Sequence, residues 1–193
     1  MLGGKFRDQI RIYCDTPQAR DPKEFEARIK KRIQDGFTFF KMDIGIGVLR
    51  NIPGTLSAPA GMSTAERANT EHMFTGIEIT DKGIAIMADH VARVREIIGM
   101  EIPLGTDHFG HIGVNSCIRL GKAFEKFNLA WMEDFIPWYR TELWKKITDA
   151  IDVPTLTGED IYLKEPFETL CREHAVDIIQ PDLASSGGIL ETK

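Results

Sequence analysis

The feature of the chain that most constrains its fold is a regular alternation of short apolar runs with amphipathic stretches of helical periodicity. In the first such stretch, Phe25, Ile29 and Ile33 recur on one helical face. The apolar runs predict strands at Ile10–Cys14, Phe37–Ile44, Pro103–Asp107, Leu129–Phe135, Pro154–Glu159 and Asp177–Leu183. The amphipathic stretches predict helices at Lys23–Gln34, Ile84–Ile98, Val114–Phe127, Leu143–Ile151 and Glu165–His174, with a further helix beginning near Gly188. Strands that alternate with helices of this length indicate βαβ units and a parallel sheet.

Two α/β architectures contain such a sheet: the (β/α)8 TIM-type barrel and the open doubly wound sheet. An open sheet that binds a dinucleotide carries G-x-G-x-x-G between its first strand and first helix. The corresponding turn here is Asp15-Thr16-Pro17-Gln18, which contains no glycine. The sequence instead places acidic residues at the ends of several strands, where a barrel keeps its catalytic groups. We therefore predict a parallel (β/α)8 barrel.

The number of units indicates that this barrel is incomplete. A complete (β/α)8 barrel takes about 250 residues, whereas the 193 residues here contain about six β/α units. The connection at about 45–80 is long and rich in Gly, Pro and Ser, and a loop of that size is usually functional. We predict one domain over residues 1–193, a partial barrel with this insertion, in which the first and sixth strands have open edges.

Composition narrows the classes of partner. The net charge of −5 argues against nucleic acid or an anionic membrane. The sequence has neither a run of ~18 apolar residues nor a signal-peptide core. Three widely spaced cysteines, Cys14, Cys117 and Cys171, favour buried structural thiols in a reducing compartment over a disulfide framework. We expect a cytoplasmic protein that acts on a small molecule.

Three strand ends carry a carboxylate at one repeating interval. Glu133 follows Asp107 by 26 residues, and Glu159 follows Glu133 by 26, which is about one β/α unit each time. The three side chains are therefore expected at equivalent places on adjacent strands. Carboxylates so close repel each other unless a cation compensates them, and their oxygens suit Mg2+ or Mn2+. The alternative is that they are ordinary polar residues that reach loop amides.

A second group of candidates surrounds these carboxylates. Lys41 and Asp43 are two residues apart on one strand, so they share a face. A lysine there can hold a substrate carboxylate, act as a base, or form an internal ion pair. His108 and His111 directly follow the third strand, where a histidine is a natural acid or base. His111 is the stronger candidate because its loop can bend back over the site, although either histidine can equally bond to the backbone.

Neighbouring residues are interpreted as structural. Asp134 and Asp160 follow the two glutamates directly, and strand alternation predicts that they face away from the site. Packing is the expected role of the aromatic residues Trp131, Trp138, Tyr139 and Trp144.

The ordered motifs resemble the barrel domain of the enolase superfamily, specifically the mandelate racemase/muconate lactonizing enzyme group. The motifs are LGGKFRDQIRIY at the start, KMD on the second strand, TDHFG on the third, WMEDF on the fourth, TGED on the fifth and IIQPDLASSGGI on the sixth. The resemblance covers nearly the whole chain apart from the insertion. The ordered series is more specific than any single motif.

The resemblance implies that Asp107, Glu133 and Glu159 bind Mg2+, with Mn2+ as a possible substitute. In this superfamily a Lys or His base works together with the metal. The implied reaction removes the proton α to a carboxylate and forms an enediolate. Asp182 matches an aspartate that orients a catalytic histidine on strand seven, a strand that lies beyond the six predicted here.

One departure from the family pattern favours acid-sugar dehydratases, and a second, from the dehydratase pattern itself, leaves the general acid unassigned. Many members carry Lys-x-Lys on strand two, whereas the second position here is Asp43, which fits a site with one lysine and one carboxylate. Dehydratases often carry Asp-x-His on strand three, whereas Phe109 stands at the third position here, between His108 and His111. The expected activity is therefore that of a hydro-lyase. Racemisation, epimerisation, cycloisomerisation and a catalytically inactive fragment are the alternatives.

Family members also have an N-terminal capping domain that closes over the barrel mouth, and the sequence here contains no counterpart of it. We therefore expect a fragment that is poorly folded alone, self-associated as a homo-oligomer, or complemented by other segments.

Overall fold

The computed structural model describes residues 3–16, 22–49, 51–57, 61, 77–107 and 112–193. Within them, the main sheet consists of β1 (Cys14–Asp15), β2 (Phe40–Asp43), β5 (Leu104–Asp107), β6 (Trp131–Glu133), β7 (Thr155–Thr157) and β8 (Ile178–Ile179). A separate antiparallel pair consists of β3 (Leu56–Ser57) and β4 (Glu78–Ile79). The α-helices are α1 (Pro22–Gln34), α3 (Asp81–Ile98), α4 (Val114–Phe124), α5 (Thr141–Thr148), α6 (Glu165–Arg172) and α7 (Ile189–Thr192). The 3-10 helices are η1 (Ile46–Leu49) and η2 (Glu125–Phe127).

The strands of the main sheet are parallel, and their order is the order in which the chain reaches them, β1-β2-β5-β6-β7-β8. A doubly wound sheet reverses its strand order at a switch point, and the described strands contain no such reversal. Parallel strands that follow one another in this way form the wall of a barrel. Within the described residues, β1 and β8 are the two edges of this wall, as the sequence predicts.

The two faces of the wall differ in chemistry. Met42 of β2 and Met132 of β6 belong to one buried apolar cluster with Met87 of α3, so this face packs against the helices. Successive side chains of a strand point to opposite faces. Lys41 and Glu133, which adjoin those two methionines, therefore lie on the inner face of the wall.

The predicted insertion contains ordered elements, because η1, β3 and β4 all fall between residues 45 and 80. Thr80 ends it and starts α3, since its hydroxyl accepts a hydrogen bond from the amide of Gly83. Ser116 of α4 accepts a hydrogen bond from the amide of Ile79 (2.8 Å) and donates one to Glu78. These bonds fix the end of the insertion beside α3 and α4.

Two expectations from the sequence are wrong. The predicted strand Ile10–Cys14 is a strand only from Cys14, and the side chains of Ile10 and Ile12 are 73% and 62% exposed. The reason is that β1 has a neighbour, β2, on one side only in the described sheet, so the residues before it lack a second strand to pack against. Cys171 is exposed, whereas Cys14 and Cys117 are buried as expected.

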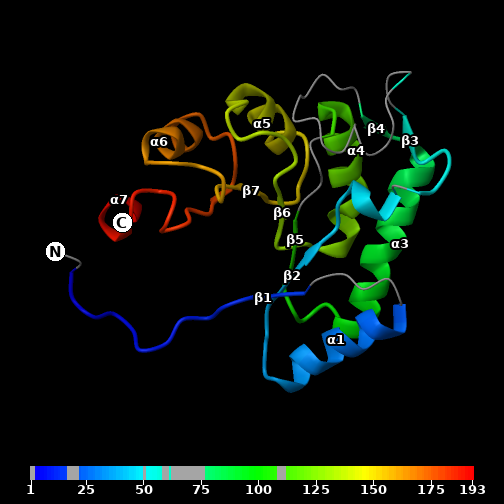
Figure 1. Ribbon diagram of the computed structural model, residues 1–193, viewed down its shortest axis with the longest axis horizontal. Coiled ribbons are helices and arrows are strands. Elements are labelled where there is room, and N and C mark those ends of the chain that lie inside the picture. The colour runs from blue at the N-terminus through cyan, green and yellow to red at the C-terminus, as the bar shows by residue number, and fades with distance from the viewer. Residues whose placement is uncertain (1–2, 17–21, 50, 58–60, 62–76, 108–111) are drawn as a thin grey trace.

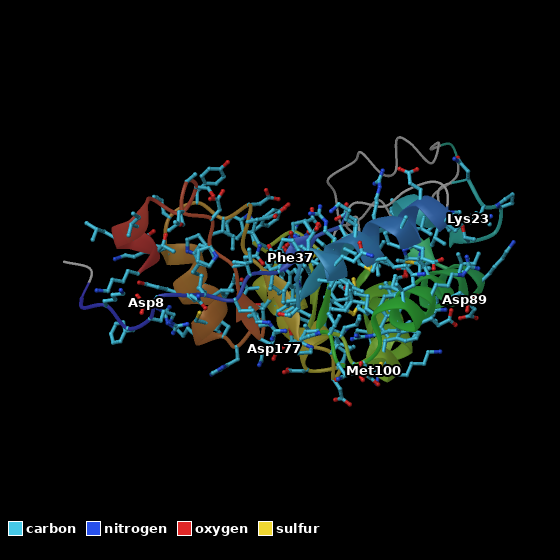
Figure 2. All side chains as sticks on the ribbon, turned by 90° about the horizontal axis from the view of Figure 1, so that it is seen from below. Asp8, Lys23, Phe37, Asp89, Met100 and Asp177 are labelled. Atoms are coloured by element: carbon cyan, nitrogen blue, oxygen red, sulfur yellow. The ribbon has the colours of Figure 1, made fainter. Side chains whose placement is uncertain are left out.

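The N-terminal arm, residues 3–12, runs outside the sheet toward the side of the molecule where α7 and the C-terminus lie (Figure 1). In Figure 2, Asp8 on this arm lies toward that end, and Lys23 and Asp89 lie toward the opposite end. A Cβ placed on Gly3 would lie 3.8 Å from Nζ of Lys193, so the two ends of the chain approach each other. Among the described helices, none has the length and apolarity that crossing a bilayer requires.

Candidate metal and catalytic site

Three adjacent strands bring three carboxylates together at the carboxyl end of the sheet. Asp107 ends β5, Glu133 ends β6, and Glu159 follows β7 by two residues. One oxygen from each lies within 4.8 Å of one oxygen from each of the others. Asp107 and Glu133 are buried, and Glu159 is half-buried. The sequence interval between these residues therefore corresponds to a real convergence in space.

Lys41 reaches the same group from β2. Its ammonium forms an ion pair with Asp107, and its Nζ lies 3.6 Å from Oε2 of Glu133. Only 6% of Lys41 is exposed, so these charges interact in a largely dry environment. Asp43 follows two residues later and lies in register with Asp107 on β5. Lys41 and Asp43 thus belong to the same end of the sheet as the three carboxylates.

The burial of these charges shifts their protonation. Burial, and then the nearby charge of Asp107, raises the pKa of the Glu133 carboxyl to about 7. Burial by itself would lower the pKa of the Lys41 ammonium, but its hydrogen bond to Asp107 and the charges of Asp107 and Glu133 hold that pKa above its usual value. Lys41 is therefore a stable cation at neutral pH.

The strongest local sign of an additional ligand is an oxygen of Glu133. Its Oε1 is buried and has no hydrogen-bond partner among the described residues. A buried carboxylate oxygen without a partner is costly. Three converging carboxylates, one with an unsatisfied oxygen, match the oxygen ligands that Mg2+ and Mn2+ prefer. The residues present therefore fit a hard divalent cation.

The sequence predicts a packing role for Trp131, but its indole also contacts the carboxylate cluster. In the structure, the indole Nε1 of Trp131 donates a hydrogen bond of 2.9 Å to Oε2 of Glu133. The ring of Tyr13 lies 5.6 Å from Nζ of Lys41, within the range of a cation–π contact. The W-x-E spacing was the available signal, because residues two apart on a strand share a face.

Asp134 bonds to the outer face of the sheet, which agrees with the sequence-based expectation that it faces away from the site. Its partner Thr157 is two residues after Thr155, which is in register with Met132 on that face. The φ of Asp134, 54°, departs from strand geometry, and its Oδ1 accepts a 2.7 Å hydrogen bond from the hydroxyl of Thr157. Burial raises the pKa of the Asp134 carboxyl to about 6, although the hydrogen bond from Thr157 opposes that change.

Of the remaining predicted residues, Asp182 is the one that the structure describes. Asp182 follows β8 and is exposed, and its Oδ1 accepts a 2.9 Å hydrogen bond from the amide of Ala184. His108 and His111 lie outside the described residues. Their predicted roles therefore stay predictions.

Comparison with known proteins adds a family and a fold. A family model described as Enolase C-terminal domain-like matches residues 24–193. The solved structure of a mandelate racemase/muconate lactonizing enzyme-like protein from Rubrobacter xylanophilus superposes with a TM-score of 0.78 at 26% identity, over 99% of this chain and 48% of that one. This likeness confirms the predicted fold, a partial enolase-superfamily barrel.

Curated relatives are similar over the full chain. The D-xylonate dehydratase of Haloferax volcanii is 30% identical, over 100% of this chain and 43% of its own length. The D-galactonate dehydratase family member of Streptomyces bingchenggensis is 29% identical, over 98% of this chain and 45% of its own length. The chain thus spans slightly less than half the length of these relatives.

Proposed function

The chain belongs to the enolase C-terminal domain-like family. We propose that it contributes the metal-binding and catalytic side chains of a hydro-lyase that dehydrates a sugar acid. The observation that carries this proposal is the convergence of Asp107, Glu133 and Glu159, with Oε1 of Glu133 buried and unpartnered among the described residues. The named activities of the relatives, dehydration of D-xylonate among them, supply the substrate class.

In this proposal, Asp107, Glu133 and Glu159 hold Mg2+, with Mn2+ as a substitute. The cation, when bound, supplies a Lewis acid for the carboxylate of the substrate and for the enediolate charge that develops on it. The protein's contribution is to fix three carboxylates on rigid strand ends before the substrate arrives, which lowers the cost of organising the site.

Lys41 has an electrostatic role in the proposed reaction. Its raised pKa keeps it protonated, which makes it a poor base and a good partner for negative charge on the substrate carboxylate. Asp43 stands in register with Asp107 at the same strand ends, and we propose that it contacts the polar part of the substrate. Loss of the α-proton and of the β-hydroxide then releases water and leaves an enol, which tautomerises to a 2-keto-3-deoxy acid.

The general acid and the orientation of the general base are part of the proposal. His111, and secondarily His108, are the candidates for the group that protonates the leaving hydroxide, because they follow the strand that ends in Asp107. Asp182 is the candidate for orienting a histidine from a further strand. Cytoplasmic location and self-association likewise stay predictions.

The proposal is tested with the protein that contains this chain and with a panel of aldonic acids: D-xylonate, D-gluconate and D-galactonate. We expect formation of a 2-keto-3-deoxy acid, detected as its semicarbazone, that EDTA abolishes and Mg2+ restores. Activity that EDTA leaves unchanged would contradict the metal site. Exchange of the α-proton with D2O without loss of water would instead identify a racemase or epimerase.

Two matched carboxylate-to-amide variants test whether Glu133 itself is required for activity. Glu133→Gln keeps the size of the side chain and removes its charge, so we expect product formation to fall by about 100- to 1,000-fold, the loss typical of one catalytic electrostatic group. Glu173→Gln makes the same change at an exposed position after α6 and serves as the control. Equal activity of the two variants would exclude Glu133 from the site.

A further inference from the structure

We propose that Trp131 is a positioning residue that turns one oxygen of Glu133 toward the metal by occupying the other. The inference rests on the proposed metal site and adds a role for a side chain outside the ligand set. A carboxylate can rotate and offer either oxygen to a cation, so a ligand that is held in one orientation binds with less loss of freedom.

The two oxygens of Glu133 have different surroundings. Oε2 accepts the 2.9 Å hydrogen bond from Nε1 of Trp131 and lies 3.6 Å from Nζ of Lys41. Oε1 is buried without a hydrogen-bond partner among the described residues. The indole N–H is a donor only, so it cannot bind a metal itself and can serve this carboxylate only by donating. Both local donors therefore face one oxygen and leave the other for a ligand.

The indole of Trp131 is itself held from three directions. Tyr13 meets it edge-on, with ring centroids 5.6 Å apart and an interplanar angle of 68°, and Phe39 lies with its centroid 5.1 Å away. On β5, Gly105 is in register with Trp131. A Cβ at that glycine would lie 2.6 Å from Cζ2 of the indole, so the ring occupies the space that the missing side chain leaves.

Gly105, Trp131 and Glu133 therefore form one unit across two strands. The glycine admits the ring, the ring presents its N–H, and the N–H fixes Oε2. A tryptophan that served only to fill the barrel interior would need no alignment of its N–H with a carboxylate. Outer-sphere donors of this kind typically change metal affinity by about 10- to 100-fold when they are removed.

The first test compares two tryptophan-to-phenylalanine variants. Trp131→Phe keeps an aromatic ring and deletes the N–H. The control is Trp144→Phe, because Trp144 is also buried but donates its N–H to the carbonyl of Pro137. Mn2+ is titrated into each protein and free Mn2+ is read by electron paramagnetic resonance. We expect Trp131→Phe to weaken Mn2+ binding about 10- to 100-fold and the control to stay within a factor of about three.

A second variant leaves the tryptophan in place. Gly105→Ala displaces the indole and its N–H, so we expect it to weaken Mn2+ binding in the same direction as Trp131→Phe. A third measurement needs no folded variant of residue 131: in the wild-type protein labelled with 15N-tryptophan, the indole proton of Trp131 should exchange slowly with solvent. The signals of the other two tryptophans are assigned by their own Phe variants.

The outcomes separate this inference from the proposed function. If wild-type protein binds no Mn2+, the metal site is wrong and the inference falls with it. If wild-type protein binds Mn2+ and Trp131→Phe binds it as tightly as Trp144→Phe does, the metal site stands and the positioning role is wrong. Fast exchange of the Trp131 indole proton would also overturn the role, because the hydrogen bond to Glu133 would then be absent.

Discussion

At the scale of single residues, Lys41 is the compensating charge of the candidate site. Its ammonium pairs with Asp107 and lies near Glu133, with almost no exposure to solvent. Removal of one partner from a buried ion pair leaves an uncompensated charge and typically costs about 3–5 kcal/mol. We therefore predict that Lys41→Met destabilises the metal-free protein by an amount in this range.

Divalent metal should reverse much of this loss, because a cation at the carboxylates replaces the missing ammonium. The measurement is Tm in EDTA and in excess Mg2+ for Lys41→Met and for Lys145→Met, which removes a half-buried lysine paired with Asp149. We expect Mg2+ to raise Tm more in Lys41→Met than in the control variant or the wild type. An equal rise in all three would contradict compensation by Lys41.

At the scale of elements, Arg95 of α3 ties together segments that are far apart in the sequence. The guanidinium is buried and donates hydrogen bonds to the carbonyls of Phe127 and Asn128 after α4, and to those of Gly99 and Ile102 before β5. We predict that Arg95→Met lowers the free energy of unfolding by about 3 kcal/mol, since one buried carbonyl and three partly buried carbonyls lose their donor. Urea titration checks this, with the exposed Arg93→Met as control; equal loss in both variants would contradict it.

The contact between α1 and α3 predicts a pH dependence. His90 of α3 stacks on Phe25 of α1, with ring centroids 5.5 Å apart, and its Nε2 is buried without a partner among the described residues. Burial, and then the charge of Arg93, lowers the pKa of the His90 imidazole. As pH falls below about 6.5, the unfolded chain therefore takes up this proton before the folded protein does, and stability decreases.

The matching variant is His90→Phe, which keeps the stacking and cannot titrate. Between pH 7.5 and 5.5, we expect Tm to fall less in His90→Phe than in wild-type protein. His174→Phe changes a histidine outside this contact and serves as the control. A parallel fall of Tm in wild type and His90→Phe would show that His90 does not contribute.

The sequence predicts elements better than it predicts contacts, for physical reasons. Helical periodicity at Met87 and Val91 reflects burial that the structure reproduces, and the 26-residue interval predicts the approach of Asp107 to Glu133, because parallel strands share an end. The choice between the two oxygens of Glu133 depends instead on a glycine in a different strand. A gap that a glycine on one strand leaves for a side chain on the next strand produces no periodic pattern in the sequence.

At the scale of the whole molecule, contacts between distant segments also explain why the first strand is shorter than predicted. Alternation of Ile10 and Ile12 with polar residues predicts a strand, but a strand also needs neighbours, and β1 is an edge of the described sheet. The family predicted from the motifs is the one whose model matches residues 24–193. The sequence motifs therefore identify the family of the barrel. Whether an edge segment forms a strand depends on whether a second strand pairs with it, which the motifs do not encode.

The open edges lead to a prediction about association. Unpaired strand edges beside exposed apolar side chains are templates for pairing with another chain, and the wall has such side chains at both ends, at Ile10 and Ile12 before β1 and at Ile179 and Leu183 around β8. We therefore expect the 193-residue chain to self-associate at micromolar concentration.

Sedimentation velocity measures the species present. The charged double variant Ile10→Lys with Ile12→Lys should shift the distribution toward monomer, because lysine commonly protects the edges of natural sheets. Met100→Lys, which adds a charge at an exposed apolar residue away from both edges, should not shift it. A wild-type chain that sediments as a monomer and unfolds in one sharp, reversible transition would show that the edges are closed by the chain itself.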